Sequence, residues 1–217
     1  MNTLHNPHVA PLLNRLFAEA DAATSPTFRS IPGSERERLL DSKTEYLQLY
    51  SLMKDLWLPV SPETGRLLYI LARSIRASTI IEFGTSFGIS TVFLASALRD
   101  NGGGHLITTE FEPSKIAKAR EHLTEGGLID LVEMREGDAL TTLSVDLPEQ
   151  VDLVLLDGAK PLYADVVRLV EKSLRPGALI IADNVDLCPG YVEHVRAANT
   201  RYLSVPVADD IELSIRL

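Results

Sequence analysis

The sequence predicts an α/β protein with a mostly parallel, Rossmann-like sheet, and two observations support this. From residue 59 onward, short apolar runs of strand length alternate with segments of helical length. Four of the runs end at a carboxylate, contributed by Glu82, Glu110, Asp157 and Asp183. Nearly continuous apolar strands are typical of parallel sheets covered by helices, and such sheets bind ligands beyond the carboxyl ends of their strands. We therefore expect the four acids to share one rim.

The first 58 residues differ in pattern and are predicted to form a helical extension (1–58) before the main domain (59–217) of a single-domain protein. Residues 11–20 form an amphipathic pattern, and Ser34 with Glu37 resembles a capping box at the start of a helix that would run to about Trp57. Residues 24–33 contain two prolines and a terminal glycine and are predicted to be a loop. That loop could be a lid or a simple connection.

The main domain is predicted to contain seven strands flanked by helices. Ser61 and Pro62 supply an N-cap and a first-turn proline for a helix over 61–76. Further helices are expected at 90–99, 113–125 and 162–174, and parallel strands at 79–83, 105–109, 132–135, 151–156 and 178–182. Residues 202–207 and 211–217 alternate with a two-residue period and predict a C-terminal antiparallel hairpin.

Composition favours a small-molecule partner in the cytoplasm. The chain has 217 residues, 45% of them hydrophobic, and a net charge of −9, which argues against nucleic acid and anionic membranes as partners. A single cysteine, Cys188, excludes an internal disulfide and is interpreted as a packed thiol. No apolar run approaches the roughly 20 residues that span a bilayer, and the first ten residues lack the pattern of a signal peptide.

The turn after the first strand predicts a ligand with a cationic group. It reads Glu82-Phe83-Gly84-Thr85-Ser86-Phe87-Gly88-Ile89-Ser90. Its glycines let the backbone approach a ligand, but the spacing is not the three-glycine dinucleotide fingerprint. Glu82 would repel a pyrophosphate and suits a positive charge.

The following strand ends indicate that the ligand is a nucleoside. Glu110 lies 26 residues after Gly84, where an acid can accept both ribose hydroxyls. Asp138 and Ala139 would border a purine ring. A nucleoside with a zwitterionic end describes S-adenosylmethionine, whereas solvated strand ends in a generic Rossmann-like fold are the alternative.

On these residues the chain resembles the class I methyltransferases, with Glu82-x-Gly84-x-x-x-Gly88 as their first motif and Glu110 as their ribose acid. The resemblance implies that S-adenosylmethionine is the cofactor. The cofactor-binding residues it implies are Glu82, Gly84, Thr85, Ser86, Gly88, Ser90, Glu110, Phe111, Asp138, Ala139 and Asp157.

A second group of polar residues predicts a metal site. Asp157 and Lys160 follow one strand, and Asp183 and Asn184 follow the next. Adjacent parallel strands bring these ends together, and two carboxylates with an amide oxygen suit Mg²⁺. Asn184 in place of a third carboxylate keeps the site near neutrality.

This group resembles the cation-dependent O-methyltransferases, which include catechol and caffeoyl-CoA O-methyltransferases. The resemblance implies Asp157, Asp183 and Asn184 as metal ligands, Lys160 as the catalytic base, and a homodimer. The expected activity is Mg²⁺-dependent methyl transfer from S-adenosylmethionine to a hydroxyl of a small catechol-like molecule.

Some positions depart from the family pattern and leave alternatives open. Gly158-Ala159 stand where the animal catechol enzymes have His-Trp, and the late acid that orients the catechol could be Asp209, Asp210 or Glu212. Tyr50 and Trp57 are expected in the core, with Trp57 alternatively beside the acceptor. The alternative functions are a metal-independent methyltransferase acting on a nitrogen or a lone hydroxyl, and a non-catalytic nucleoside-binding protein.

Overall fold

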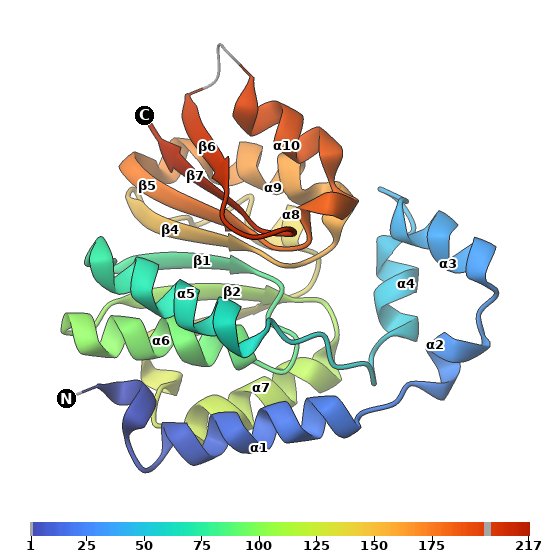
Figure 1. Cartoon of the computed structure of the whole chain (residues 1–217), viewed down its shortest axis with the longest axis horizontal. Helices are drawn as coiled ribbons and strands as arrows, with labels where there is room; N and C mark the ends of the chain where they lie inside the picture. Colours follow the sequence, from blue (N-terminus) through green and yellow to red (C-terminus); the bar gives the residue numbers. More distant parts are fainter. Residues whose placement is uncertain (1, 198–200) are drawn as a thin grey trace.

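A computed structural model describes residues 2–197 and 201–217 and shows a mixed sheet between two layers of helices (Figure 1). Within the described residues the sheet has seven strands in the order β3-β2-β1-β4-β5-β7-β6. The strands are β1 Thr79–Phe83, β2 His105–Glu110, β3 Val132–Glu136, β4 Val151–Leu156, β5 Leu174–Ala182, β6 Tyr202–Pro206 and β7 Glu212–Arg216. Strands β1 to β5 are parallel, and β6 and β7 are antiparallel, which confirms the predicted sheet.

The two faces of the sheet bury separate cores. One face packs on α5 Pro62–Ser74, α6 Ile89–Asn101 and α7 Pro113–Glu125. The other packs on α8 Ala139–Thr142, α9 Tyr163–Val170 and α10 Pro189–Arg196. Successive strand residues alternate between the cores, so Ile80 lies in the first and Ile81 in the second. Chain order reverses between β1 and β4, where ligands of such sheets bind.

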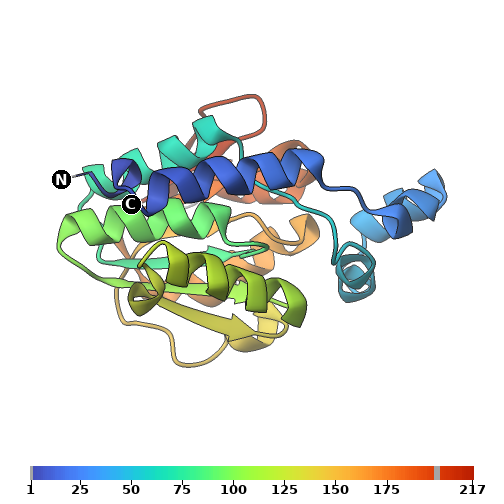
Figure 2. The same ribbon diagram turned by 90° about the horizontal axis from the view of Figure 1, so that it is seen from below.

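The N-terminal helix α1 (Val9–Ala22) packs onto the first core beside α6 and α7 (Figure 2). Ahead of it, Thr3 donates its hydroxyl to Asp100 at 2.6 Å and its amide to the same carboxylate at 2.9 Å. The Tyr69 hydroxyl also donates to Asp100, at 2.6 Å. These bonds attach the first residues to α5 and α6.

The prediction of one helix from residue 34 to about 57 is wrong. The chain forms α3 Gly33–Leu40 and α4 Tyr46–Leu52, separated by a turn. In that turn the Ser42 hydroxyl accepts from the amides of Thr44 and Glu45, at 3.3 and 3.0 Å. A side chain that bonds nearby amides competes with helix hydrogen bonds, so the helix stops there. Pro32, not Ser34, occupies the N-cap of α3, and it makes no side-chain capping bond.

Other boundaries also differ from the prediction. The expected loop 24–33 contains α2 Pro26–Ser30, capped by the Ser25 hydroxyl, which accepts from the Phe28 amide. The predicted helix 162–174 ends at Val170, and Leu174 already belongs to β5, where it pairs with Val151. Helices α8 and α10 were not predicted. Single 3₁₀ turns are η1 Thr3–His5, η2 Ile129–Leu131, η3 Lys160–Leu162, η4 Glu171–Ser173 and η5 Val185–Leu187.

Helices α3 and α4 stand apart from the body of the molecule (Figures 1 and 2). Their buried residues Leu39 and Leu49, with Met53 directly after α4, form a third small cluster of their own. We call α3 and α4, residues 33–52, the cap. No helix in the described ranges is both long and apolar enough to cross a membrane.

Candidate functional site

The glycine turn after β1 is tightly packed against two neighbouring strands. Gly84 has φ +106°, and a Cβ there would lie 2.5 Å from the backbone oxygen of Asp157. The amides of Gly84 and Thr85 donate to the backbone oxygen of Thr109, at 3.3 and 3.1 Å. Gly88, with φ +87°, is the N-cap of α6. Only glycine meets the steric demand at position 84, and the turn holds the N-terminus of α6 at the predicted rim.

The turn leaves two buried polar atoms without partners. Glu82 is fully buried in β1, where its Oε2 accepts from the hydroxyls of Thr91 and Thr108 at 2.6 Å each, while its Oε1 has no partner. Burial raises the pKa of Glu82 to about 7, although the hydroxyls bonded to the carboxylate stabilise its charge and favour a lower pKa. Ser86, at φ +48°, also has an unpartnered buried hydroxyl. The structure thus places Glu82 within the sheet layer, and the unpaired atoms fit the polar end of a zwitterionic ligand.

Glu110 is held at the end of β2 by two backbone amides. Its Oε2 accepts from the Ser86 amide at 2.8 Å, and its Oε1 accepts from the Glu112 amide at 2.9 Å. The carboxylate faces two neighbouring hollows of the rim, which meet at Gly84 and Glu110. This position allows the predicted contact with ribose hydroxyls.

One of these hollows contains residues that the sequence did not assign to the site. Trp57 lines it and stacks on Phe87, with ring centroids 4.1 Å apart, and it also packs against the first core, as the sequence predicted. Lys115 also lines it and is buried, which lowers the pKa of its ammonium. The charge of Glu110 opposes that shift. Ser90 and Asp157 also line this hollow.

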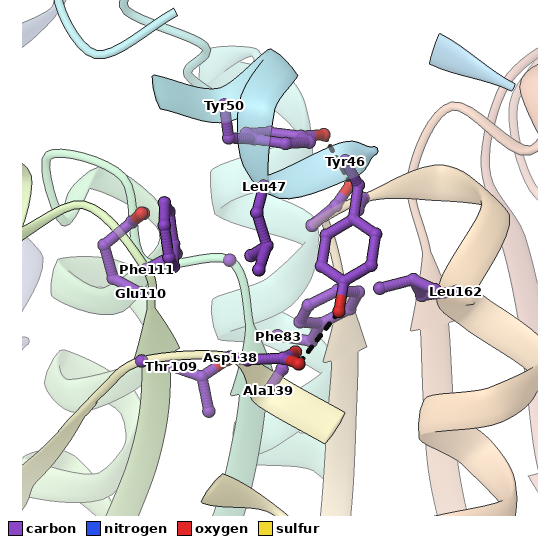
Figure 3. A pocket seen from close by; sticks show the side chains of 14 residues that line it. Tyr46, Leu47, Tyr50, Phe83, Thr109, Glu110, Phe111, Asp138, Ala139 and Leu162 are labelled. Atoms are coloured by element: carbon purple, nitrogen blue, oxygen red, sulfur yellow. Dashed lines mark hydrogen bonds between the residues drawn. The ribbon is translucent and has the colours of Figure 1, made fainter. Parts of the chain in front are cut away.

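The other hollow has the residues expected around a purine, and the cap covers it (Figure 3). Asp138 and Ala139, predicted to border the base, line it together with Phe111, which was predicted to bind the cofactor. Asp138 also caps α8, because its Oδ1 accepts from the Leu140 amide at 3.0 Å. The cap contributes Tyr46 and Tyr50.

The two cap tyrosines are bonded to the rim. Tyr46 donates to Asp138 Oδ2 at 2.9 Å, and Tyr50 donates to the backbone oxygen of Gly158 at 3.2 Å. Tyr50 therefore forms a wall of the hollow and also packs against the second core, as the sequence predicted. Its role was hidden because it depends on where the cap docks.

The predicted metal and base residues also meet. Leu156 pairs with Ala182, so Asp157 and Asp183 follow neighbouring positions of β4 and β5. The Lys160 ammonium donates to Asp157 Oδ1 at 2.9 Å and to the Tyr163 hydroxyl at 2.9 Å. That hydroxyl donates in turn to the backbone oxygen of Asp183, at 2.9 Å. Tyr163, which the sequence analysis missed, fixes Lys160 between the two strand ends.

Burial makes the carboxylate pair costly to ionise. It raises the pKa of Asp157, although the neighbouring Lys160 charge opposes this. Burial, and then the charge of Asp157, raises the pKa of Asp183 to about 7. A divalent cation would relieve both effects, and two carboxylates with the Asn184 amide are hard oxygen donors that fit Mg²⁺. Among the described residues, no three His, Cys, Asp or Glu side chains form a metal-binding group.

The three candidates for the late acid are in different environments. Asp210 lines a hollow together with Asp183 and Asn184. Glu212 is buried and accepts from Arg196 at 2.7 Å and from Ser204 at 2.5 Å. Asp209 is exposed. Asp210 is therefore the candidate placed beside the carboxylate pair.

Comparison with known proteins agrees with this geometry. Residues 81–185 match a protein family described as a methyltransferase domain. The O-methyltransferase TomG from Streptomyces achromogenes, involved in tomaymycin synthesis and crystallised with S-adenosylmethionine, superposes with a TM-score of 0.66 at 26% identity. That match covers 93% of this chain and 94% of TomG. Residues 81–185 are thus similar to a methyltransferase domain, and the fold is that of the class I methyltransferases.

Two curated sequence relatives of the chain are O-methyltransferases. The catechol O-methyltransferase of Niastella koreensis is 38% identical over 129 residues, which are 58% of this chain and 58% of the relative. The catechol O-methyltransferase of Mycobacterium tuberculosis is 35% identical over 126 residues, which are 58% of this chain and 56% of the relative. The chain therefore spans slightly more than half the length of the curated relatives it matches.

Proposed function

We propose that this protein transfers a methyl group from S-adenosylmethionine to a hydroxyl of a small catechol-like molecule, with Mg²⁺ as a required cofactor. The observation that carries the proposal is the bonded group of Lys160, Asp157 and Tyr163 beside Asp183 and the glycine turn. Neither the turn nor the carboxylates alone would indicate this chemistry.

The cofactor residues divide by the part of the ligand they would hold. Glu110 would accept the ribose hydroxyls, because two backbone amides already fix its carboxylate. Glu82 Oε1 and the Ser86 hydroxyl, both unpartnered, would serve the amino-acid end. Phe111, Asp138 and Ala139 would surround the base. Gly84 and Gly88, with Thr85 and Ser90, shape the turn between these parts.

Asp157, Asp183 and Asn184 would hold Mg²⁺, which supplies positive charge that orients the acceptor and stabilises its deprotonated oxygen. Lys160 is the proposed base and would take the hydroxyl proton at its Nζ when that nitrogen is neutral. Tyr163 holds this nitrogen toward the carboxylates. Much of the acceleration would come from positioning the acceptor oxygen against the methyl donor.

The acceptor would be small and would lie near Asp210. Asp210 and Ser61 line the same hollow as Asp183 and Asn184. Gly158 and Ala159 add little bulk at the boundary between this region and the cofactor. We therefore favour Asp210 over Asp209 and Glu212 as the side chain that orients the acceptor.

The proposal is tested by incubating the protein with S-adenosylmethionine and catechol, with Mg²⁺ or with EDTA, and by measuring the gain of one methyl group by mass spectrometry. We expect product only with Mg²⁺, and its loss in Asp157→Ala and Asp183→Ala. Activity that persists in EDTA would select the metal-independent alternative. If calorimetry detected no binding of S-adenosylmethionine, the protein would lack this activity.

We also propose, from the sequence and the resemblance, that the protein is a homodimer, that it is cytoplasmic without nucleic-acid or membrane partners, and that the chain divides at residue 58. Sedimentation at several protein concentrations tests the first of these.

A further inference from the structure

We propose that the cap completes the nucleoside pocket, with Tyr50 and Tyr46 forming an aromatic wall against the base of S-adenosylmethionine, so that cofactor binding holds the cap on the sheet. The inference rests on the proposed cofactor. It assigns the base a binding surface on residues 33–52, outside the matched methyltransferase domain of residues 81–185.

The first argument is the position of the rings. Tyr46, Tyr50 and Phe111 line the same hollow, and Figure 3 shows their rings around it with Leu47 between them. Residues at or just after the strand ends form two sides of this hollow, and residues of the cap form the side opposite them. A planar base that stacks between aromatic rings binds more tightly than one without such a wall.

The second argument is that the loop after β4 cannot supply this wall. A Cβ at Gly158 would lie 2.5 Å from the ring of Phe83, so position 158 has no room for a side chain toward that ring. The next residue, Ala159, has only a methyl group, which is buried in the second core. Tyr50 reaches this loop from the cap and bonds the backbone oxygen of Gly158.

The third argument is how the cap is attached. Its buried leucines pack in their own cluster, and among its described residues only Tyr46 and Tyr50 pack against a core of the sheet. Polar side-chain bonds link it to the body: Tyr46 to Asp138, Tyr50 to Gly158, and Lys43 to Asp165 at 2.8 Å. Two of these three bonds lie in the nucleoside pocket. A ligand that stacks on Tyr50 therefore adds directly to the attachment of the cap.

Calorimetry with two ligands tests the wall. S-adenosylhomocysteine carries the base, the ribose and the amino-acid end, whereas 5′-methylthioadenosine keeps the base and the ribose but lacks the amino-acid end. Tyr50→Ala should weaken both ligands by the same factor, roughly 5- to 100-fold, and Tyr50→Phe should stay within about threefold because it keeps the ring. Thermal unfolding in the absence of ligand identifies any variant that has lost its fold.

Tyr46→Phe has a matched control in Tyr69→Phe. Both tyrosines are partly buried and donate to an aspartate, Asp138 and Asp100 respectively, but Tyr69 lies away from the pocket. We expect Tyr46→Phe to weaken both ligands about 3- to 10-fold and Tyr69→Phe to leave binding unchanged. Equal effects of the two substitutions would contradict a specific role for Tyr46.

Hydrogen exchange measures the coupling itself. Saturating S-adenosylhomocysteine should slow exchange in peptides from residues 33–52 in the wild type, and much less in Tyr50→Ala at equal saturation. Two outcomes in which the wild type binds ligand would overturn the inference. One is that Tyr50→Ala binds the ligands as tightly as the wild type does. The other is that ligand binding does not slow hydrogen exchange in the cap. Weakening of S-adenosylhomocysteine alone would place Tyr50 at the amino-acid end and also overturn it. Failure of the wild type to bind either ligand would instead refute the proposed cofactor.

Discussion

Single residues of the rim are arranged for ligand binding at a cost in stability. Glu82 is fully buried, yet one of its oxygens has no partner. A buried carboxylate without full hydrogen bonding destabilises the folded state. By contrast, both oxygens of the buried Glu212 accept hydrogen bonds. Substitution of glutamine for each of the two glutamates should therefore change the free energy of unfolding in opposite directions.

Glu82→Gln should stabilise the protein at alkaline pH while weakening the cofactor. The folded-state pKa of Glu82 is raised to about 7 by burial, so its contribution to stability is present below about pH 4.5 and is lost as the pH rises through 7. The free energy of unfolding of the variant should exceed that of the wild type by about 1–3 kcal/mol at pH 8, and the gain should vanish near pH 4. Urea unfolding at several pH values measures it.

The control for this prediction is Glu212→Gln. Arg196 and Ser204 outweigh burial and lower the pKa of Glu212, so its contribution is present at neutral pH and is lost in acid. This variant should be less stable than the wild type at pH 8. A loss of stability in Glu82→Gln at pH 8 would show that its free oxygen is satisfied in solution.

Lys160→Gln should separate catalysis from cofactor binding. The side chain bonds Asp157 and Tyr163 but does not line the nucleoside hollow. Loss of a general base typically lowers the rate by roughly 100-fold or more, whereas the Kd for S-adenosylhomocysteine should change by less than about threefold. The exposed Lys172→Gln is the control. An unchanged methylation rate in Lys160→Gln would exclude Lys160 as the base.

At the scale of elements, the glycine turn is fixed by packing as well as by backbone conformation, and two glycines separate these effects. Gly84 and Gly102 have φ +106° and +105°, but a Cβ at Gly84 would lie 2.5 Å from the Asp157 backbone oxygen, whereas Gly102 has open space. Gly84→Ala should cost about 1–3 kcal/mol more than Gly102→Ala. Chemical denaturation measures both values. Equal costs would show that the turn can move away from β4.

The sheet could be predicted from the sequence because its signals are local. The apolar run of β4 from Leu153 to Leu156 is bounded by Asp152 and Asp157, and its buried pattern has no competing period. The break between α3 and α4 was missed because the five polar residues 41–45 include no proline or glycine, and the helix ends there through bonds of the Ser42 hydroxyl to nearby amides. Four residues, as in α8, are too few for a helical period to be recognised.

The same distinction applies to the site. Glu110, Asp157 and Asp183 were predictable because strand register brings the ends of parallel strands together. Tyr50 and Lys115 carry no local signal, since one depends on the docking of the cap and the other on how α7 lies against the turn. The acids at strand ends were thus found from the pattern, whereas Tyr50 from α4 and Lys115 from α7 were not.

At the scale of the molecule, the site combines parts that fold around different cores. β1 and α6 present the glycine turn from the first core, while Lys160 and Tyr163 are held by the second. The carboxylates Asp157 and Asp183 follow strands shared by both. A ligand that bridges them should therefore stabilise the whole fold, and not a single loop.

Mg²⁺ should raise the stability of the protein through Asp183. The free energy of unfolding increases by RT ln(1 + [Mg²⁺]/Kd), about 1.4 kcal/mol at tenfold excess over Kd. We expect thermal unfolding to shift upward with Mg²⁺ in the wild type and in Asp21→Asn, which removes an exposed carboxylate on α1. The shift should disappear in Asp183→Asn, because that variant leaves one carboxylate at the site. An equal shift in all three proteins would mean that Mg²⁺ acts by screening the net charge of −9, and the metal site would have to be abandoned.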